Sequence, residues 1–195
     1  MVAAAIVPGS DITLRHVGVN PTRVSVINIL RQMGANIVLS NELDVGGEPV
    51  ADVRVRYAPL KGITIPEDQV PLAIDEFPAI FIAAACAEGT TILSGAEELR
   101  VKESDRIQSM ADGLVILGID AQPTVDGICI LGGQLGSGSV HSHDDHRIAM
   151  AFAIAALRAS GEIIVLDCNN VGTSFPDFVG LAGQIGINLT SETMS

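Results

Sequence analysis

The apolar and polar positions of the chain repeat one order of patterns three times. In each copy an alanine-rich run precedes a β-branched segment, an amphipathic segment ending near glycine, and one or two further β-branched segments. Apolar spacings of three and four predict helices, whereas alternating or short β-branched runs predict strands. The matching segments GSDITL, EGTTIL and SGEIIV recur at intervals of roughly 70 to 80 residues, which indicates whole α/β units rather than a solenoid.

These patterns predict the following elements. The first copy comprises an apolar run at 2–7, a strand at 11–17, a helix at 21–33 closed by Gly34, and strands at 36–40 and 51–57. The second comprises a helix at 76–88, a strand at 90–93, a helix at 103–117 before Gly118, and a hairpin of 121–125 and 128–131 about Asp126-Gly127. The third comprises a helix at 145–159, a strand at 162–166, a helix at 176–185 before Gly186, and a strand at 187–190. A flexible loop at 135–139 is expected before the first of these helices.

The three alanine-rich helices are too apolar to face water. The simplest α/β architecture places them at the centre, with the sheets around the outside and a pseudo-threefold relation between the copies. The expected repeats are approximately 1–60, 61–135 and 136–195, of the βαβαββ type.

Composition and charge exclude several classes of function. Apolar residues make up 48% of the 195 residues and aromatic ones 3%, so the core is aliphatic. The net charge of −12 argues against nucleic-acid binding, which requires a basic face. No apolar run is long enough to span a membrane, and the N-terminus lacks the basic region of a signal peptide. Its apolar start resembles the tail of a helix, so we expect the chain to begin inside a larger unit.

Metal and disulfide chemistry are not expected. Three distant cysteines are typical of buried apolar positions in a reducing compartment, and the three histidines between 141 and 146 form no zinc pattern.

The segment LRVKESDRI at 99–107 concentrates basic residues in an acidic chain. At helical spacing Lys102 and Arg106, and Glu103 and Arg106, are neighbours near a helix start. Backbone N–H groups and the helix dipole favour anions at such an end, so cations there indicate an anionic ligand. A solvated, self-neutralising run of charges is the alternative interpretation.

Other helix starts carry similar residues. Asp144-Asp145-His146-Arg147 combines acids suited to an N-cap with an arginine in the first turn, and Asp75-Glu76 precedes the helix at Pro78. Helix capping is the alternative role for these acids. In GTSFPDF, Thr173 or Ser174 is an expected N-cap with Pro176 in the first turn, and Arg23 in NPTR is either a cleft residue or surface charge.

Taken together, LRVKESDRI, DDHRIAMAF and GTSFPDF closely resemble the 5-enolpyruvylshikimate-3-phosphate synthases, or 3-phosphoshikimate 1-carboxyvinyltransferases, along essentially the whole chain. The resemblance implies two lobes of three repeated units each, with helices inside and sheets outside, and places this chain as the C-terminal lobe without the N-terminal one. It implies transfer of the enolpyruvyl group of phosphoenolpyruvate to the 5-hydroxyl of shikimate 3-phosphate, with release of phosphate and without a cofactor.

The resemblance also implies the role of each matching residue. Asp75 is the proton acceptor at the 5-hydroxyl, Lys102 contacts shikimate 3-phosphate and the reacting centre, and Glu103 transfers a proton at the methylene carbon. Arg106 and Arg147 hold phosphoenolpyruvate. Further candidate contacts are Glu98, His146 and Thr173. Some members of the family have asparagine at the position of Glu98, and some carry a lysine at the position of Thr173.

This resemblance predicts a cytoplasmic protein of aromatic amino acid biosynthesis whose partners are the two substrates and the missing lobe. We expect the lobe to be inactive alone, because two-substrate catalysis needs both walls of the cleft. The alternatives are a non-catalytic anion-binding module that kept the fold, and a fragment that associates with itself.

Overall fold

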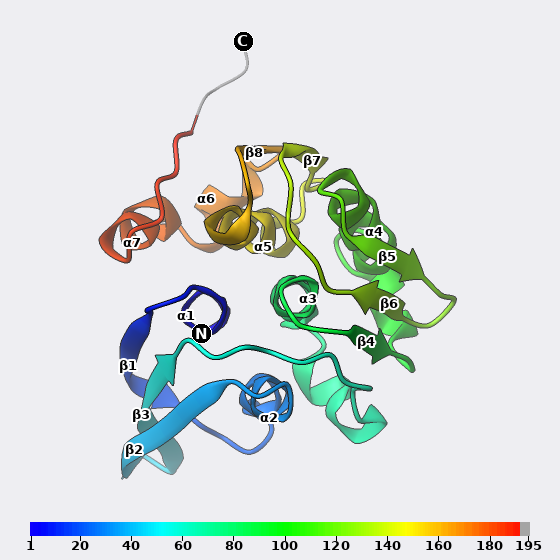
Figure 1. The fold of residues 1–195 in the computed structure, drawn as a ribbon. Coiled ribbons are helices and arrows are strands. Elements are labelled where there is room, and N and C mark those ends of the chain that lie inside the picture. Colours follow the sequence, from blue (N-terminus) through cyan, green and yellow to red (C-terminus); the bar gives the residue numbers. More distant parts are fainter. Residues whose placement is uncertain (192–195) are drawn as a thin grey trace.

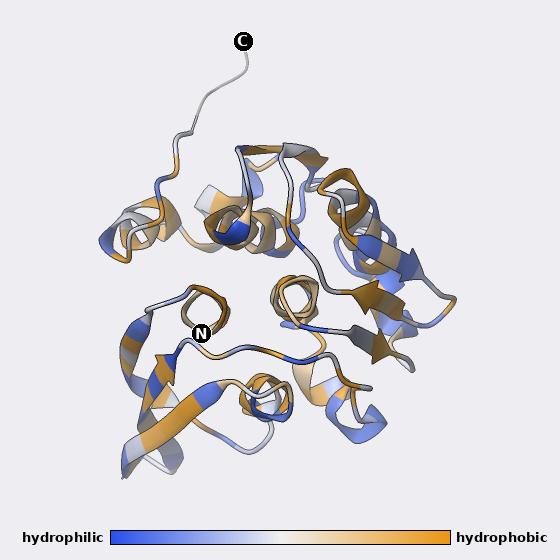
Figure 2. Cartoon of the chain, in the orientation of Figure 1, coloured by the Kyte–Doolittle hydropathy of each residue, from blue (hydrophilic) through white to orange (hydrophobic). Residues whose placement is uncertain are grey.

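A ring of sheets and helices surrounds three apolar central helices in the computed structural model, which describes residues 1–191 (Figure 1). The central helices are α1 (Val2–Ile6), α3 (Phe77–Ala85) and α5 (His146–Ala155). Helix α3 packs against both others, and small alanine side chains allow this close approach. Figure 2 shows the predominantly apolar character of α3, whereas the outer elements mix apolar and polar residues. Central helices with sheets outside confirm the expected fold class.

Within residues 1–191, three sheets cover the outside. The first has the antiparallel order β1-β3-β2, from β1 (Asp11–Gly18), β2 (Asn36–Val45) and β3 (Glu48–Arg56). The second has the antiparallel order β4-β6-β5, from β4 (Thr90–Leu93), β5 (Asp120–Pro123) and β6 (Ile128–Leu131). In the third, β7 (Gly138–His141) pairs in parallel with β8 (Ile163–Leu166).

The remaining helices connect these layers. They are α2 (Ser25–Gln32), α4 (Arg106–Ile116), α6 (Asn170–Ser174), α7 (Phe178–Gln184) and the 3₁₀ turns η1 (Glu67–Gln69), η2 (Pro71–Ala73), η3 (Glu97–Val101) and η4 (Ala156–Arg158). The expected closures at Gly34 and Gly118 are confirmed, because both take a positive φ of +96° and +83° directly after α2 and α4. Such backbone favours glycine, which has no Cβ to clash.

The third repeat departs from the pattern. The expected strand at 187–190 is wrong, because the Ile187 amide donates to the Ala182 carbonyl and the buried Ile187 side chain closes the end of α7 instead. The expected loop at 135–139 is wrong for its last two residues, because β7 begins at Gly138. Buried Val140 of β7 lies opposite Val165 of β8. Four residues are too short for the alternation of a strand to be recognised in the sequence.

The expected capping of the last helix is also wrong. Thr173 and Ser174 lie inside α6, and Asp177 occupies the N-cap position of α7. The predicted helix therefore starts later, after Pro176.

Gly113 lies where α4 and α5 approach closely. A Cβ built there would lie 2.2 Å from Cζ of buried Phe152, which belongs to α5. We therefore expect Gly113→Ala to lower the free energy of unfolding by about 1–2 kcal/mol. The free-energy cost of overpacking exceeds what alanine gains over glycine in helix propensity. Urea denaturation will measure the change. Gly183→Ala in α7, where nothing lies within 4 Å of the new Cβ, is the matched control and should not destabilise the chain.

Candidate functional site

The charged residues singled out in the sequence converge where α3, α4 and α5 begin. Asp75 comes two residues before α3, Arg106 is the first residue of α4 and Arg147 is the second residue of α5. Three segments that lie far apart in the sequence thus bring one carboxylate and two guanidinium groups together.

Arg106 is the centre of this cluster. Its side chain is 0% exposed, and its guanidinium group donates to three carboxylates. Nε donates to Asp145 Oδ2 at 2.8 Å, Nη2 to Glu103 Oε2 at 2.5 Å and Nη1 to Asp75 Oδ1 at 3.3 Å. A planar fork with five donors suits several oxygen atoms around one group, which a lysine could not match.

Asp145 anchors Arg106 and caps α5. Its carboxylate is fully buried; Oδ1 accepts from the Arg147 amide at 2.9 Å, and Oδ2 accepts from Arg106 and from Ser104 Oγ at 3.2 Å. Asp145 was predicted only as an N-cap, and its bond to Arg106 was missed. An arginine in each of two helix starts, beside a capping aspartate, was the signal that could have indicated the pair.

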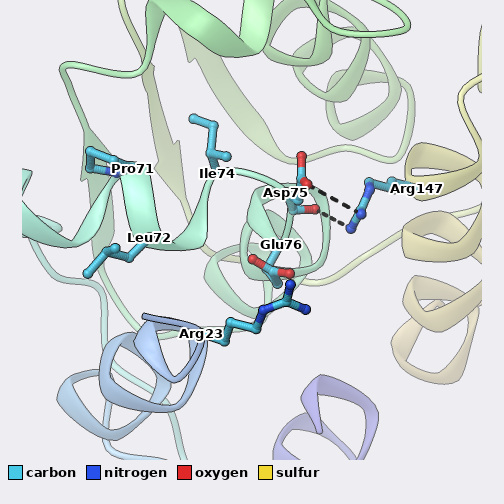
Figure 3. Close-up of a pocket in the computed structure, with 7 residues that line it drawn as sticks. All are labelled: Arg23, Pro71, Leu72, Ile74, Asp75, Glu76 and Arg147. Carbon is cyan, nitrogen blue, oxygen red and sulfur yellow. Dashed lines mark hydrogen bonds and ion pairs between the residues drawn. The ribbon is translucent and has the colours of Figure 1, made fainter. Parts of the chain in front are cut away.

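Asp75 is an accessible carboxylate in contact with three cations. Its side chain is 46% exposed. Arg106 Nη1 lies 3.3 Å, Arg147 Nη2 3.5 Å and Lys102 Nζ 3.9 Å from its oxygen atoms. Arg147 Nη1 also donates to the Asp75 carbonyl at 2.9 Å, so one guanidinium group fixes both the backbone and the side chain (Figure 3).

The local conformation of Lys102 differs from the helical spacing that we expected. Lys102 follows η3 in an extended conformation, and α4 begins only at Arg106, with Asp105 as its N-cap. The expected i,i+4 pair of Lys102 and Arg106 within one helix is therefore wrong. Lys102 pairs instead with Glu98, one turn back. Asp105 caps the start of α4, because its carboxylate accepts the Gln108 amide at 3.0 Å.

A pocket of about 290 Å³ opens beside Asp75. Its walls come from three parts of the chain and comprise Arg23, Pro71, Leu72, Ile74, Asp75, Glu76 and Arg147 (Figure 3). Burial raises the pKa of the Glu76 carboxyl, and the neighbouring Asp75 adds to the rise, while Arg147 and Arg23 oppose it. Glu76 holds the N-cap position of α3 but makes no capping hydrogen bond with its side chain. Its carboxylate therefore belongs to the pocket rather than to the helix end.

The two other candidates lie outside this network. His146 begins α5, and Thr173 lies exposed in α6; within residues 1–191 neither side chain forms an ion pair or hydrogen bond with the cluster.

Residues 1–191 contain no group of three His, Cys, Asp or Glu side chains arranged to hold a metal ion. The three cysteines are free, and burial raises the pKa of the half-buried Cys86 thiol to about 11, so it is a poor nucleophile at neutral pH. Over the same residues, every helix falls short of the length and apolar character that crossing a bilayer demands.

The arrangement suits two tasks. The guanidinium groups of Arg23 and Arg147 at the open pocket can bind carboxylate or phosphate groups. An accessible carboxylate among them can accept a proton from a bound hydroxyl group.

Comparisons with known proteins show which family the chain is similar to. The family model described as EPSP synthase (3-phosphoshikimate 1-carboxyvinyltransferase) matches residues 1–181. A 3-phosphoshikimate 1-carboxyvinyltransferase from Methylococcus capsulatus is 66% identical over 97% of this chain, which corresponds to 43% of the relative.

Solved structures are also similar. An EPSP synthase from Acinetobacter baumannii is 58% identical with a TM-score of 0.93, over 96% of this chain and 44% of that one. The enolpyruvyl transferase NikO from Streptomyces tendae shares the fold, with a TM-score of 0.67 at 17% identity over 100% of this chain and 43% of its own. The chain thus spans less than half the length of these proteins.

Proposed function

Because this chain belongs to the EPSP synthase (3-phosphoshikimate 1-carboxyvinyltransferase) family, we propose that it forms one wall of the active site of such a transferase. That enzyme moves the enolpyruvyl group of phosphoenolpyruvate to the 5-hydroxyl of shikimate 3-phosphate and releases phosphate. The observation that carries the proposal is the convergence of Asp75, Arg106 and Arg147 beside an open pocket.

Each residue has a distinct task in this proposal. Asp75 accepts the proton of the 5-hydroxyl as the new C–O bond forms, and Lys102, 3.9 Å from it, contacts shikimate 3-phosphate. Arg147 and Arg106 bind the anionic groups of phosphoenolpyruvate. Glu103, whose Oε2 lies 2.5 Å from Arg106 Nη2, gives a proton to the methylene carbon as the C–O bond forms and takes one back when phosphate leaves and the double bond is restored. Proton transfer by positioned side chains contributes about 10²- to 10⁴-fold to such reactions.

The opposite wall belongs to the part of the relatives that this chain does not match. With 43% of the relative's length covered, we place this chain as the C-terminal lobe and its partner as the N-terminal lobe. The free cysteines fit a reducing compartment, and we place the protein in the cytoplasm.

Reconstitution tests this function. We expect the 195-residue chain alone to show no turnover. Mixed with the non-matching part of the Methylococcus capsulatus relative, it should release phosphate from phosphoenolpyruvate only when shikimate 3-phosphate is present. The reason is that both walls are needed to orient two reactants. A colorimetric phosphate assay measures the reaction.

Assembly must be shown separately from turnover. Sedimentation velocity will establish a one-to-one complex, and Arg147→Gln will serve as the impaired variant. A stable one-to-one complex that releases no phosphate under these conditions would contradict the proposal.

A further inference from the structure

Arg23 faces the same pocket as Arg147 but comes from a different repeat. It lies between β1 and α2, on a turn in which the Arg23 amide donates to the Asn20 carbonyl at 2.8 Å. The Asn20 side chain stiffens this turn, because its Oδ1 accepts from the Thr22 amide and hydroxyl at 3.0 and 2.9 Å. The backbone therefore holds the base of the Arg23 side chain at the mouth of the pocket.

The other cations of the site are already engaged. Arg106 binds three carboxylates, Lys102 binds Glu98, and Arg147 binds Asp75 through two groups. Over residues 1–191, the ion pairs within 4.0 Å do not include Arg23. Arg23 is thus the guanidinium group at this pocket that can engage a ligand without giving up a protein partner.

Glu76 is the acid that Arg23 faces. Figure 3 shows the two side chains directed toward one another across the pocket, while Asp75 is directed to Arg147. The Glu76 carboxyl group is half-buried, and no cation lies close enough to form an ion pair with it in the described structure. An oxyanion entering between Arg23 and Arg147 would meet this carboxylate and be repelled by it.

We propose that Arg23 is a further anion-binding residue of this pocket, that with Arg147 it binds a phosphate group of a small-molecule ligand, and that Glu76 competes with that group. A phosphate dianion can accept hydrogen bonds on several sides, which suits two guanidinium groups from different walls better than a planar carboxylate does. The inference rests on the proposed function only in that both substrates named there carry a phosphate group.

Titration of the 195-residue chain with inorganic phosphate, followed by NMR chemical shifts at low ionic strength, tests this assignment. Arg23→Gln should raise the Kd for phosphate about three- to tenfold, because it removes charge-assisted hydrogen bonds at a partly solvated site. Glu76→Gln should lower it about threefold, because it removes a like charge. Acetate should bind more weakly than phosphate and respond less to Arg23→Gln.

Charge-matched variants separate local contacts from the field of the whole protein. Arg15→Gln changes an exposed arginine of β1, and Glu88→Gln changes an exposed acid that follows the C-terminal end of α3. Neither should alter phosphate binding by more than about 1.5-fold, since distant exposed charges are screened. Arg23→Lys keeps the charge but not the fork, so its Kd should lie between those of the unchanged chain and Arg23→Gln. Thermal unfolding will verify that each variant is folded.

The outcomes distinguish this inference from the proposed function. If Arg147→Gln weakens phosphate binding and Arg23→Gln does not, the assignment of Arg23 is overturned while the proposed function stands. Equal effects of Arg23→Gln and Arg15→Gln on the Kd for phosphate would also overturn the assignment of Arg23. If the titrations behave as expected and the reconstituted complex is inactive, the proposed function fails and the assignment of Arg23 stands.

Discussion

Replacing Arg106 by methionine should lower the free energy of unfolding of the chain by about 3–5 kcal/mol, because it leaves a buried carboxylate without its cation. Asp145 is 0% exposed and lies 2.8 Å from Arg106 Nε. The other two acids bound to Arg106 are about half exposed, so water can replace the lost contact. Almost all of the effect should therefore come from Asp145. Urea denaturation of the isolated chain will measure it.

Two further variants isolate the origin of that loss. Arg106→Met combined with Asp145→Asn should recover about 1–2 kcal/mol, since asparagine keeps a capping oxygen and carries no charge. Arg54→Met breaks the exposed ion pair of Arg54 with Asp11, 2.5 Å long, and should cost less than about 1 kcal/mol. A stability of Arg106→Met close to that of Arg54→Met would show that the buried pair does not stabilise the fold.

In the reconstituted complex, Asp75→Asn should reduce kcat about 10²- to 10⁴-fold, because asparagine cannot accept the proton of the substrate hydroxyl. Asparagine has nearly the same size and retains an oxygen for the cations around it. The KM values should consequently change much less than kcat. Phosphate release at varied concentrations of each substrate will separate the two constants.

Asp75 is 46% exposed, so its replacement should change the free energy of unfolding by less than about 1 kcal/mol. Asp68→Asn, an exposed acid in η1, is the matched control and should leave kcat unchanged. Loss of activity that follows loss of stability across these variants would contradict a role of Asp75 in proton transfer.

The repeated pattern predicted the architecture well because it depends on local signals. The strands 90–93 and 128–131 were predicted with the bounds of β4 and β6, and alanine-rich runs became central helices as expected. Alternation and helical spacing are properties of neighbouring residues, so the sequence alone reveals them. The third repeat was predicted worst, since β7 is defined by its partner β8, from which α5 separates it in the chain.

The candidate site was predicted in its residue types and in the Glu103–Arg106 pair, but not in its other connections. Charged residues at three helix starts indicated an anionic ligand, but which acid binds which base depends on how the helices pack. Lys102 pairs back to Glu98 because η3 precedes it, and Asp145 meets Arg106 because α4 and α5 begin side by side. Contacts between residues that lie 39 positions apart leave no periodic trace in the sequence.

The burial of Arg106 also limits how the site can evolve. A change at this position should cost about 3–5 kcal/mol of stability whatever it does to ligand affinity, so natural variation there should be scarce. Arg23 and Glu76 line an open pocket, and a change at either should cost less stability. Adaptation of ligand affinity in this lineage should therefore proceed through the rim of the cluster while its centre stays constant.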